Sequence, residues 1–120
     1  MQRNTPAFVT DFATQPTKAS INEISDPAIV EKPYQSIVWR HFTNARDTLT
    51  AGIWEAGPHK ELCHCDYDEL CHLLEGRVRL TDNNGISRTF EAGSTFVVAA
   101  GFEGTWENLT DVRKVYAILR

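Results

Sequence analysis

Short runs of β-branched and aromatic residues, each ended by turn-forming residues, are the feature of this sequence that most restricts its fold. Runs of this length suit strands better than helices, and closely spaced turns between them are typical of a β-sandwich or barrel. The clearest turn is Asp82-Asn83-Asn84-Gly85, which follows the alternating segment 77–81 and predicts a hairpin. We expect about nine strands, over residues 36–42, 48–55, 62–67, 69–74, 77–81, 86–90, 95–98, 104–108 and 112–119.

The first residues differ from the rest of the chain, because they are polar, lack a regular period and contain the turn signal Asp26-Pro27. We therefore predict a single all-β domain with an N-terminal arm over residues 1–35 and a β-barrel over residues 36–120. The arm is expected to lie over the barrel or to cross to a partner subunit. No window of the sequence holds a helical apolar period without an interrupting Gly or Pro.

Charge and apolar content exclude several classes of partner. The net charge is −4 and the pI is about 5.5, so the chain lacks the basic surface that binds nucleic acid. No stretch is long and apolar enough to span a bilayer, and the N-terminus has no apolar segment of the kind found in secretory signals. The three cysteines, Cys63, Cys65 and Cys71, are closely grouped and odd in number, which predicts reduced thiols and a cytoplasmic location.

Two blocks of the sequence resemble the signature motifs of the cupin superfamily. The first motif reads G-x5-H-x-H-x3-4-E-x6-G, and its second half matches Glu69 and, after six intervening residues, Gly76. The second reads G-x5-P-x-G-x2-H-x3-N, and Gly93, Gly101 and Asn108 fall in its registers. The resemblance implies an RmlC-like cupin jelly roll, whose two sheets enclose a pocket.

Within that superfamily, the sequence is similar to the branch related to (S)-ureidoglycine aminohydrolase, most of whose members have no assigned function. The similarity covers a little over half of the chain and lies in residues 52–56, 74–78, 90–93 and 101–107. It implies a small-molecule ligand in the pocket, such as a ureido or amino compound.

The metal site that the resemblance implies is incomplete in this sequence. Cupins with a full site use three histidines and one glutamate, a set that suits divalent transition metals. The third histidine corresponds to Gly104, and the H-x-H pair corresponds either to Leu62 and His64 or to Cys63 and Cys65, depending on the spacing to the glutamate. The candidate metal ligands are His64 and Glu69, a set too small for us to expect a bound metal, and the cofactor is unknown.

Alternation along the strands predicts which side chains share the pocket, because residues two apart lie on one face. Glu69 and Cys71 form one such pair, and Lys114 and Tyr116 form another. The candidate catalytic residues are Glu69, as base or ligand, and Tyr116. The candidate ligand-binding residues are Trp54, Cys71, Trp106 and Lys114. The alternative interpretations are core packing for the tryptophans and cysteine and solvation for the lysine, and His59, in a Gly-Pro-His-Lys turn, is expected in solvent.

Two hypotheses for function follow. In the first, the chain is a small-molecule-binding cupin that performs acid–base or metal-assisted chemistry on a small polar metabolite. In the second, it is a non-catalytic module, a metabolite sensor or scaffold, with a degenerate metal site. A fold hosts many functions, so the fold alone does not choose between them. We also expect a homodimer, because cupins of this kind usually pair sheet against sheet.

Overall fold

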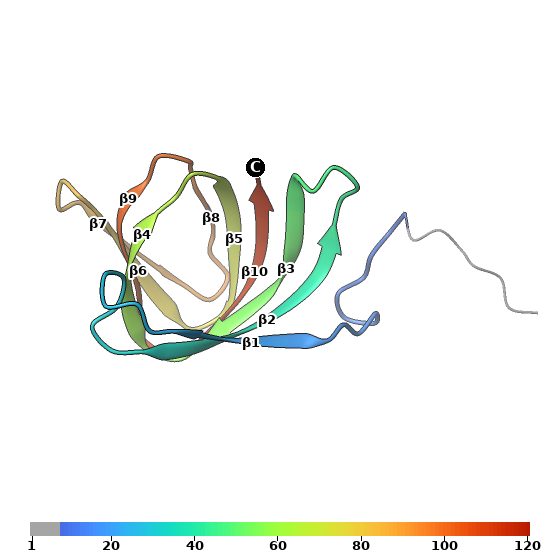
Figure 1. The fold of residues 1–120 in the computed structure, drawn as a ribbon, viewed down its shortest axis with the longest axis horizontal. Coiled ribbons are helices and arrows are strands. Elements are labelled where there is room, and N and C mark those ends of the chain that lie inside the picture. Colours follow the sequence, from blue (N-terminus) through green and yellow to red (C-terminus); the bar gives the residue numbers. More distant parts are fainter. Residues whose placement is uncertain (1–7) are drawn as a thin grey trace, which may run out of the picture.

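Two antiparallel sheets face each other in the structure, a computed structural model that describes residues 8–120 (Figure 1). The six-stranded sheet has the order β1-β2-β3-β10-β5-β8. Its strands are β1 (Ala19–Ile24), β2 (Tyr34–Thr43), β3 (Leu49–Ala56), β10 (Val112–Leu119), β5 (Asp68–Glu75) and β8 (Thr95–Val98). The four-stranded sheet contains β4 (His59–His64), β9 (Glu103–Asn108), β6 (Arg77–Asp82) and β7 (Ser87–Glu91), in that order.

The all-β prediction is confirmed, since residues 8–120 contain only strands, turns and loops and therefore no helix that could cross a membrane. Eight of the nine expected strands are present with shifts of at most two residues at their ends, whereas the strand expected over 62–67 lies three residues earlier, at His59–His64. A tenth, β1, lies within the predicted arm and pairs with β2, with Ala19 opposite Trp39. The sequence pattern does not predict β1 because most of its residues are exposed and backbone pairing alone holds this edge strand. The first seven residues of the arm lie outside the described residues.

The core lies between the two sheets and draws on both. Leu73 on β5 and Val78 on β6 are completely buried, and Trp106 on β9 packs in the same cluster. Burial of a side chain of the size of Leu or Val contributes roughly 1.5–3 kcal/mol. Alternation therefore fixes the register of each strand, because a slip by one residue would turn these side chains to solvent.

Strand β10 occupies the centre of the larger sheet and presents its inward side chains to the cavity. It pairs with β3 on one side, where Lys114 lies opposite Trp54, and with β5 on the other, where Ile118 lies opposite Glu69. The predicted shared face of Lys114 and Tyr116 is confirmed, since both side chains line the same cavity. Pairing in β10 thus brings together residues that are far apart in the sequence.

The chain passes from the larger sheet to the smaller one through Gly76, between β5 and β6. Its φ is +93°, a conformation that glycine adopts freely and other residues rarely do. A Cβ at this position would also overlap the carbonyl oxygen of Asp111, so the neighbouring loop can approach only because the side chain is absent. The glycine is needed both for the turn and for the close packing of the two loops.

We predict that Gly76→Ala destabilises the protein more than Gly93→Ala. Both glycines have a φ of +93°, but a Cβ at Gly93 would meet no atom within 4 Å. The shared backbone strain should cost about 1–3 kcal/mol in each variant, and the overlap at Gly76 should add at least about 1 kcal/mol. Urea unfolding of both variants measures the difference, and equal losses would show that the overlap is relieved without cost.

Candidate functional site

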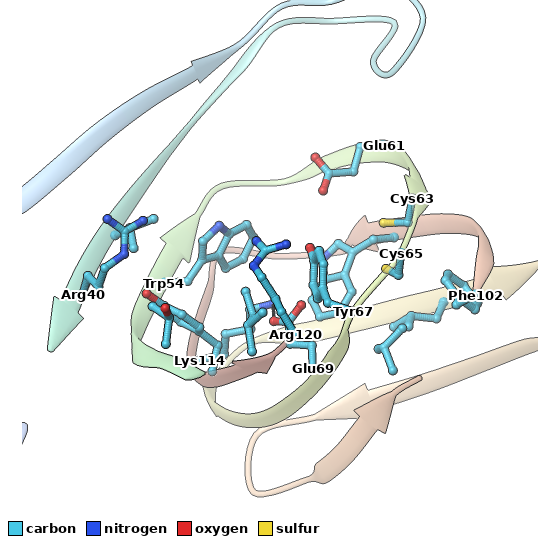
Figure 2. Close-up of a pocket in the computed structure, with 17 residues that line it drawn as sticks. Arg40, Trp54, Glu61, Cys63, Cys65, Tyr67, Glu69, Phe102, Lys114 and Arg120 are labelled. Carbon is cyan, nitrogen blue, oxygen red and sulfur yellow. Dashed lines mark hydrogen bonds and ion pairs between the residues drawn. The ribbon is translucent and has the colours of Figure 1, made fainter. Parts of the chain in front are cut away.

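A cavity of about 280 Å³ lies between the two sheets, a size that suits a small metabolite (Figure 2). Its walls include aromatic side chains from both sheets, among them Trp54 on β3 and Trp106 on β9. Five charged side chains also line it: Arg40, Glu61, Glu69, Lys114 and Arg120. The cavity therefore combines an aromatic wall with several convergent charges.

Lys114 and Glu69 form an ion pair inside the cavity, with 2.8 Å between Nζ and Oε2. Their side chains are only 7% and 13% exposed. Burial by itself would lower the pKa of Lys114, but the adjacent carboxylate outweighs it and holds this pKa above its ordinary value. Lys114 is thus a charged ammonium group at physiological pH.

Cys71 lies beneath this ion pair and is sealed from the cavity. Its Sγ is 3.3 Å from Glu69 Oε2 and 3.8 Å from Lys114 Nζ, which confirms that Glu69 and Cys71 share a face. The side chain is 0% exposed and does not line the cavity, so the structure does not support its predicted contact with a ligand. Burial raises the pKa of the Cys71 thiol to about 12, and Cys71 instead supports the carboxylate of Glu69 as a neutral neighbour.

Strand β4 presents Glu61 and Cys63 to the cavity and turns His64 to the outside, and Cys65, directly after the strand, also lines the cavity. The structure thus selects the register in which two thiols replace the histidine pair. The His64 side chain is 79% exposed and contacts Glu103, with 2.8 Å between Nδ1 and Oε1. The predicted pairing of His64 with Glu69 at a metal is therefore absent from the structure. His64 follows Cys63 by one residue, and successive side chains on a strand point to opposite faces of the sheet.

The residues present do not fit the metal site that the fold family implies. Glu69 is already paired with an ammonium group, and the cavity-facing positions of the histidine pair are occupied by Cys63 and Cys65. A Cβ at Gly104 would overlap the carbonyl oxygen of Thr81, so the backbone leaves no room for a third ligand there. Within residues 8–120, no three His, Cys, Asp or Glu side chains cluster as a metal site requires.

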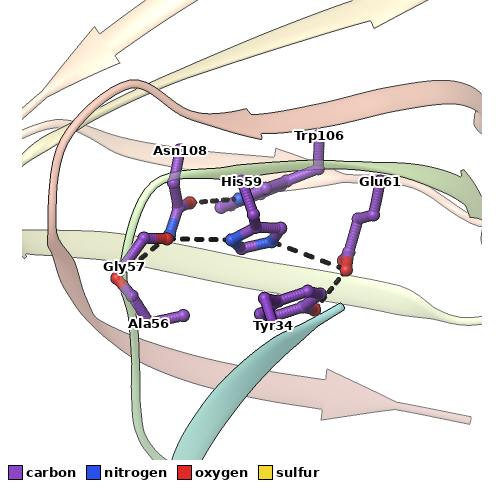
Figure 3. Close-up of polar contacts among 7 residues, drawn as sticks. All are labelled: Tyr34, Ala56, Gly57, His59, Glu61, Trp106 and Asn108. Carbon is purple, nitrogen blue, oxygen red and sulfur yellow. Dashed lines mark hydrogen bonds and ion pairs between the residues drawn. The ribbon is translucent and has the colours of Figure 1, made fainter. Parts of the chain in front are cut away.

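The indole of Trp106 is oriented by a hydrogen-bond chain that joins the two sheets (Figure 3). Its Nε1 donates to Asn108 Oδ1 at 2.7 Å, and Asn108 Nδ2 donates to the carbonyl oxygens of Ala56 at 3.2 Å and Gly57 at 3.0 Å. Asn108 therefore connects β9 of the smaller sheet to the end of β3 in the larger one. Trp106 packs in the core and its ring also lines the cavity, whereas its contact with a ligand stays a prediction.

A second polar cluster, formed by Tyr34, His59 and Glu61, lies beside this chain (Figure 3). The Tyr34 hydroxyl donates to Glu61 Oε2, and the Tyr34 and His59 rings stack with centroids 3.5 Å apart. His59 Nδ1 donates to the Gly57 carbonyl at 2.9 Å, while its Nε2 lies 3.5 Å from Glu61 Oε2. The expectation that His59 lies in solvent is wrong, since its side chain is only 3% exposed under the Tyr34 ring.

Sequence reasoning missed five polar residues that line the cavity: Arg40, Thr50, Glu61, Tyr67 and Arg120. Glu61 and Tyr67 have the same parity as Glu69, so extending the alternation backwards along the chain would have found them. Arg120 comes from the end of β10, and its guanidinium lies 4.8 Å from the centroid of the Tyr67 ring. Arg40 gives no such signal, because a bulge in β2 follows it.

Comparison with known proteins identifies related sequences and folds. The family model described as the EutQ-like cupin domain matches residues 43–116. A protein of unknown function from Pseudomonas syringae pv. tomato is 33% identical with a TM-score of 0.73, over 82% of this chain and 44% of that one. A Thermotoga maritima protein is also 33% identical, with a TM-score of 0.52, over 53% of this chain and 73% of that one.

The fold also matches more distant cupins. The EutQ protein of Clostridium difficile is 16% identical with a TM-score of 0.64, over 72% of this chain and 63% of that one. This likeness shows the fold alone. The chain thus spans less than two thirds of the length of the Pseudomonas and Clostridium proteins. No curated protein matches the chain.

We predict that the free energy of unfolding falls as the pH rises from 9 towards 12. The folded state holds the Cys71 proton up to a pKa of about 12, whereas the unfolded thiol loses it near 9.0, so alkaline pH favours the unfolded chain. One such thiol contributes a slope of up to about 1.4 kcal/mol per pH unit. Urea unfolding under reducing conditions measures this slope, and Cys71→Ala should reduce it. An unchanged slope in that variant would contradict the assignment.

Proposed function

Because the chain belongs to the EutQ-like cupin family, we propose that it binds a small polar metabolite in the cavity between its sheets. The observation that carries this proposal is that the cavity lining combines two solvent-exposed arginines, neither of which pairs with a carboxylate among the described residues, with a carboxylate that has one free oxygen. A cupin fold hosts many functions, so the proposal depends on these side chains and not on the fold.

The carboxylate of Glu69 offers one oxygen to a ligand. Its contacts with Lys114 and Cys71 both involve Oε2, and within residues 8–120 no group is hydrogen-bonded to Oε1. A ligand N–H group that donated to Oε1 would satisfy an acceptor in a site largely shielded from water. Amide, amine and ureido groups have this chemistry.

Two arginines give the cavity a preference for an acidic group. Arg40 and Arg120 line it, and neither forms an ion pair with a carboxylate among the described residues. The charges of Lys114 and Glu69 offset each other, so the two guanidinium groups outnumber the remaining anion, Glu61. Guanidinium groups bind carboxylates through paired, charge-assisted hydrogen bonds. The favoured ligand therefore carries both an N–H donor and a carboxylate, as ureido and amino acids do.

Glu69 would act on such a ligand as a proton acceptor, since a carboxylate within hydrogen-bond distance of an N–H group is placed for acid–base chemistry. Tyr116 lines the same cavity, and burial raises its pKa, so it stays a neutral hydroxyl that can donate to the ligand. The second candidate is a sensor or scaffold that binds the same ligand without turnover. The loss of the metal ligands favours this candidate.

We predict that N-carbamoylglycine, which has a ureido group and a carboxylate, stabilises the protein more than ethylurea or propionate, which each have one of the two. A ligand at a hundredfold its Kd adds about 2.7 kcal/mol to the free energy of unfolding. Arg40→Gln should weaken binding about tenfold by removing one charge-assisted contact, whereas the exposed Arg77→Gln, outside the cavity, should not. Thermal unfolding with calorimetric titration measures both effects, and product analysis separates an enzyme from a sensor. Equal responses to all three compounds would reject the ligand class.

We propose that the protein resides in the cytoplasm, because its three cysteines are free thiols. We also propose that the chain forms a homodimer through the outer face of the six-stranded sheet. Ile21 on β1, Leu70 on β5 and Val97 on β8 are exposed on this face, and Leu70 lies directly opposite Val97. Exposed apolar neighbours such as Leu70 and Val97 are typical of an interface, and Ile21 adds an exposed apolar residue at the opposite edge of the same sheet. A second copy of the same face would bury them.

We predict that the wild-type protein elutes as a dimer at micromolar concentration and that Val97→Lys converts it to a monomer. The new charge would be buried without a partner in the interface. Leu62→Lys is the matched control, because Leu62 is equally apolar and exposed but lies on the other sheet. Light scattering after size exclusion measures the mass, and a monomeric wild type would refute the dimer.

A further inference from the structure

Two indole rings surround the ammonium group of Lys114. Its Nζ lies 4.1 Å from the centroid of the Trp106 ring and 4.7 Å from that of Trp54. The two rings are 6.3 Å apart at an interplanar angle of 78°, so they form adjacent walls of a cage. The carboxylate of Glu69, 2.8 Å from Nζ, completes it. Aromatic faces combined with a carboxylate are the groups by which proteins recognise ammonium ions.

The cage is built by the tertiary structure from both sheets. Lys114 and Trp54 are cross-strand partners on β10 and β3, and Glu69 comes from β5 of the same sheet. Trp106 comes from β9 of the opposite sheet and is held by its hydrogen bond to Asn108. The ammonium group therefore lies between the sheets, next to the carboxylate that corresponds to the metal-binding glutamate of other cupins.

The surrounding backbone and side chains disfavour a metal ion next to Glu69 and favour a different cation there. Gly104 has no room for a side chain, and Cys63 and Cys65, which face the cavity where the histidine pair would be, carry thiols rather than imidazoles. The carboxylate that remains would still be a buried, uncompensated charge without a positive partner. Lys114 supplies that partner from within the chain.

We propose that Trp54, Trp106 and Glu69 form an alkylammonium site whose occupant is the side chain of Lys114. This tethered ammonium takes the place of the divalent metal of cupins with a complete ligand set. It gives the cavity a fixed positive charge that can attract a carbonyl or carboxylate oxygen of the ligand. Only this last step rests on the function proposed above, because the cage itself is defined by the geometry of the protein alone.

The cage can be tested by chemical rescue. Lys114→Ala removes three carbons and the ammonium group, which n-propylammonium would replace. We expect n-propylammonium chloride to raise the melting temperature of Lys114→Ala in a saturable manner, with an apparent Kd at least tenfold lower than that of 1-propanol. Sodium chloride at the same ionic strength controls for screening, and Glu69→Gln in the same background should abolish the rescue. Equal rescue by 1-propanol would overturn the proposal, because the site would then recognise the shape of the propyl chain and not the positive charge.

The wild-type protein provides a measurement that does not depend on the stability of the variant. The ring currents of two indoles should shift the Lys114 ε-methylene and ammonium proton resonances upfield of every other lysine, and Trp106→Leu should reduce the shift. Metal analysis after dialysis against Mn²⁺, Ni²⁺ or Zn²⁺ should find far less than one ion per chain. Unshifted Lys114 resonances, or a stoichiometric metal in the wild type, would overturn the proposal.

These outcomes are separable from the proposed function. Rescue and upfield resonances without any binding of N-carbamoylglycine by the wild type would leave the ammonium cage intact and reject the proposed ligand. Binding of N-carbamoylglycine without rescue or upfield resonances would support the proposed ligand and reject the ammonium cage. Lys114→Met, which keeps an unbranched side chain as far as Cε and removes the charged Nζ, tests the last step. We expect N-carbamoylglycine to bind this variant at least tenfold more weakly than the wild type, and equal affinity would overturn that step.

Discussion

Lys114 and Glu69 place two opposite charges in the interior of a barrel that is otherwise built largely from apolar and aromatic side chains. Neither charge is tolerable alone, since removal of one partner of a buried ion pair typically costs about 3–5 kcal/mol. Strands β5 and β10 must therefore pair in the register that brings these two residues within hydrogen-bond distance. The same register sets Cys71 under the carboxylate and opens its second oxygen to the cavity.

The remaining walls of the cavity are arranged around this pair by a separate network. Asn108 accepts from the indole of Trp106 and donates to two carbonyl oxygens at the end of β3, so it fixes one wall of the cavity relative to the other sheet. Tyr34 and His59 stack next to it and hold Glu61 at the edge of the cavity. The polar groups at this end of the barrel are thus largely paired within the protein, whereas Arg40 and Arg120 form no ion pair with a carboxylate among residues 8–120.

The loss of the cupin metal ligands extends beyond the substitution of single side chains. At Gly104 the neighbouring strand β6 lies so close that no side chain fits, and the thiols of Cys63 and Cys65 face the cavity where the histidine pair would be. A lysine in an aromatic cage compensates the glutamate that remains. A histidine at position 104 alone would not restore a metal site, because β6 would have to move and Glu69 would still be paired with Lys114.

Much of the fold was determined by the sequence itself, because strands of alternating residues with Gly- and Asn-rich turns have few other solutions. That alternation also predicted the shared faces of Glu69 with Cys71 and of Lys114 with Tyr116, since period-two geometry is local. It failed at β1, an exposed edge strand held by backbone pairing, and at His59, whose burial comes from stacking under Tyr34, a residue distant in the sequence. The choice of register on β4 and the meeting of Lys114, Trp54 and Trp106 were decided only by the tertiary structure, because each depends on how strands from opposite sheets approach one another, and no local pattern encodes that distance.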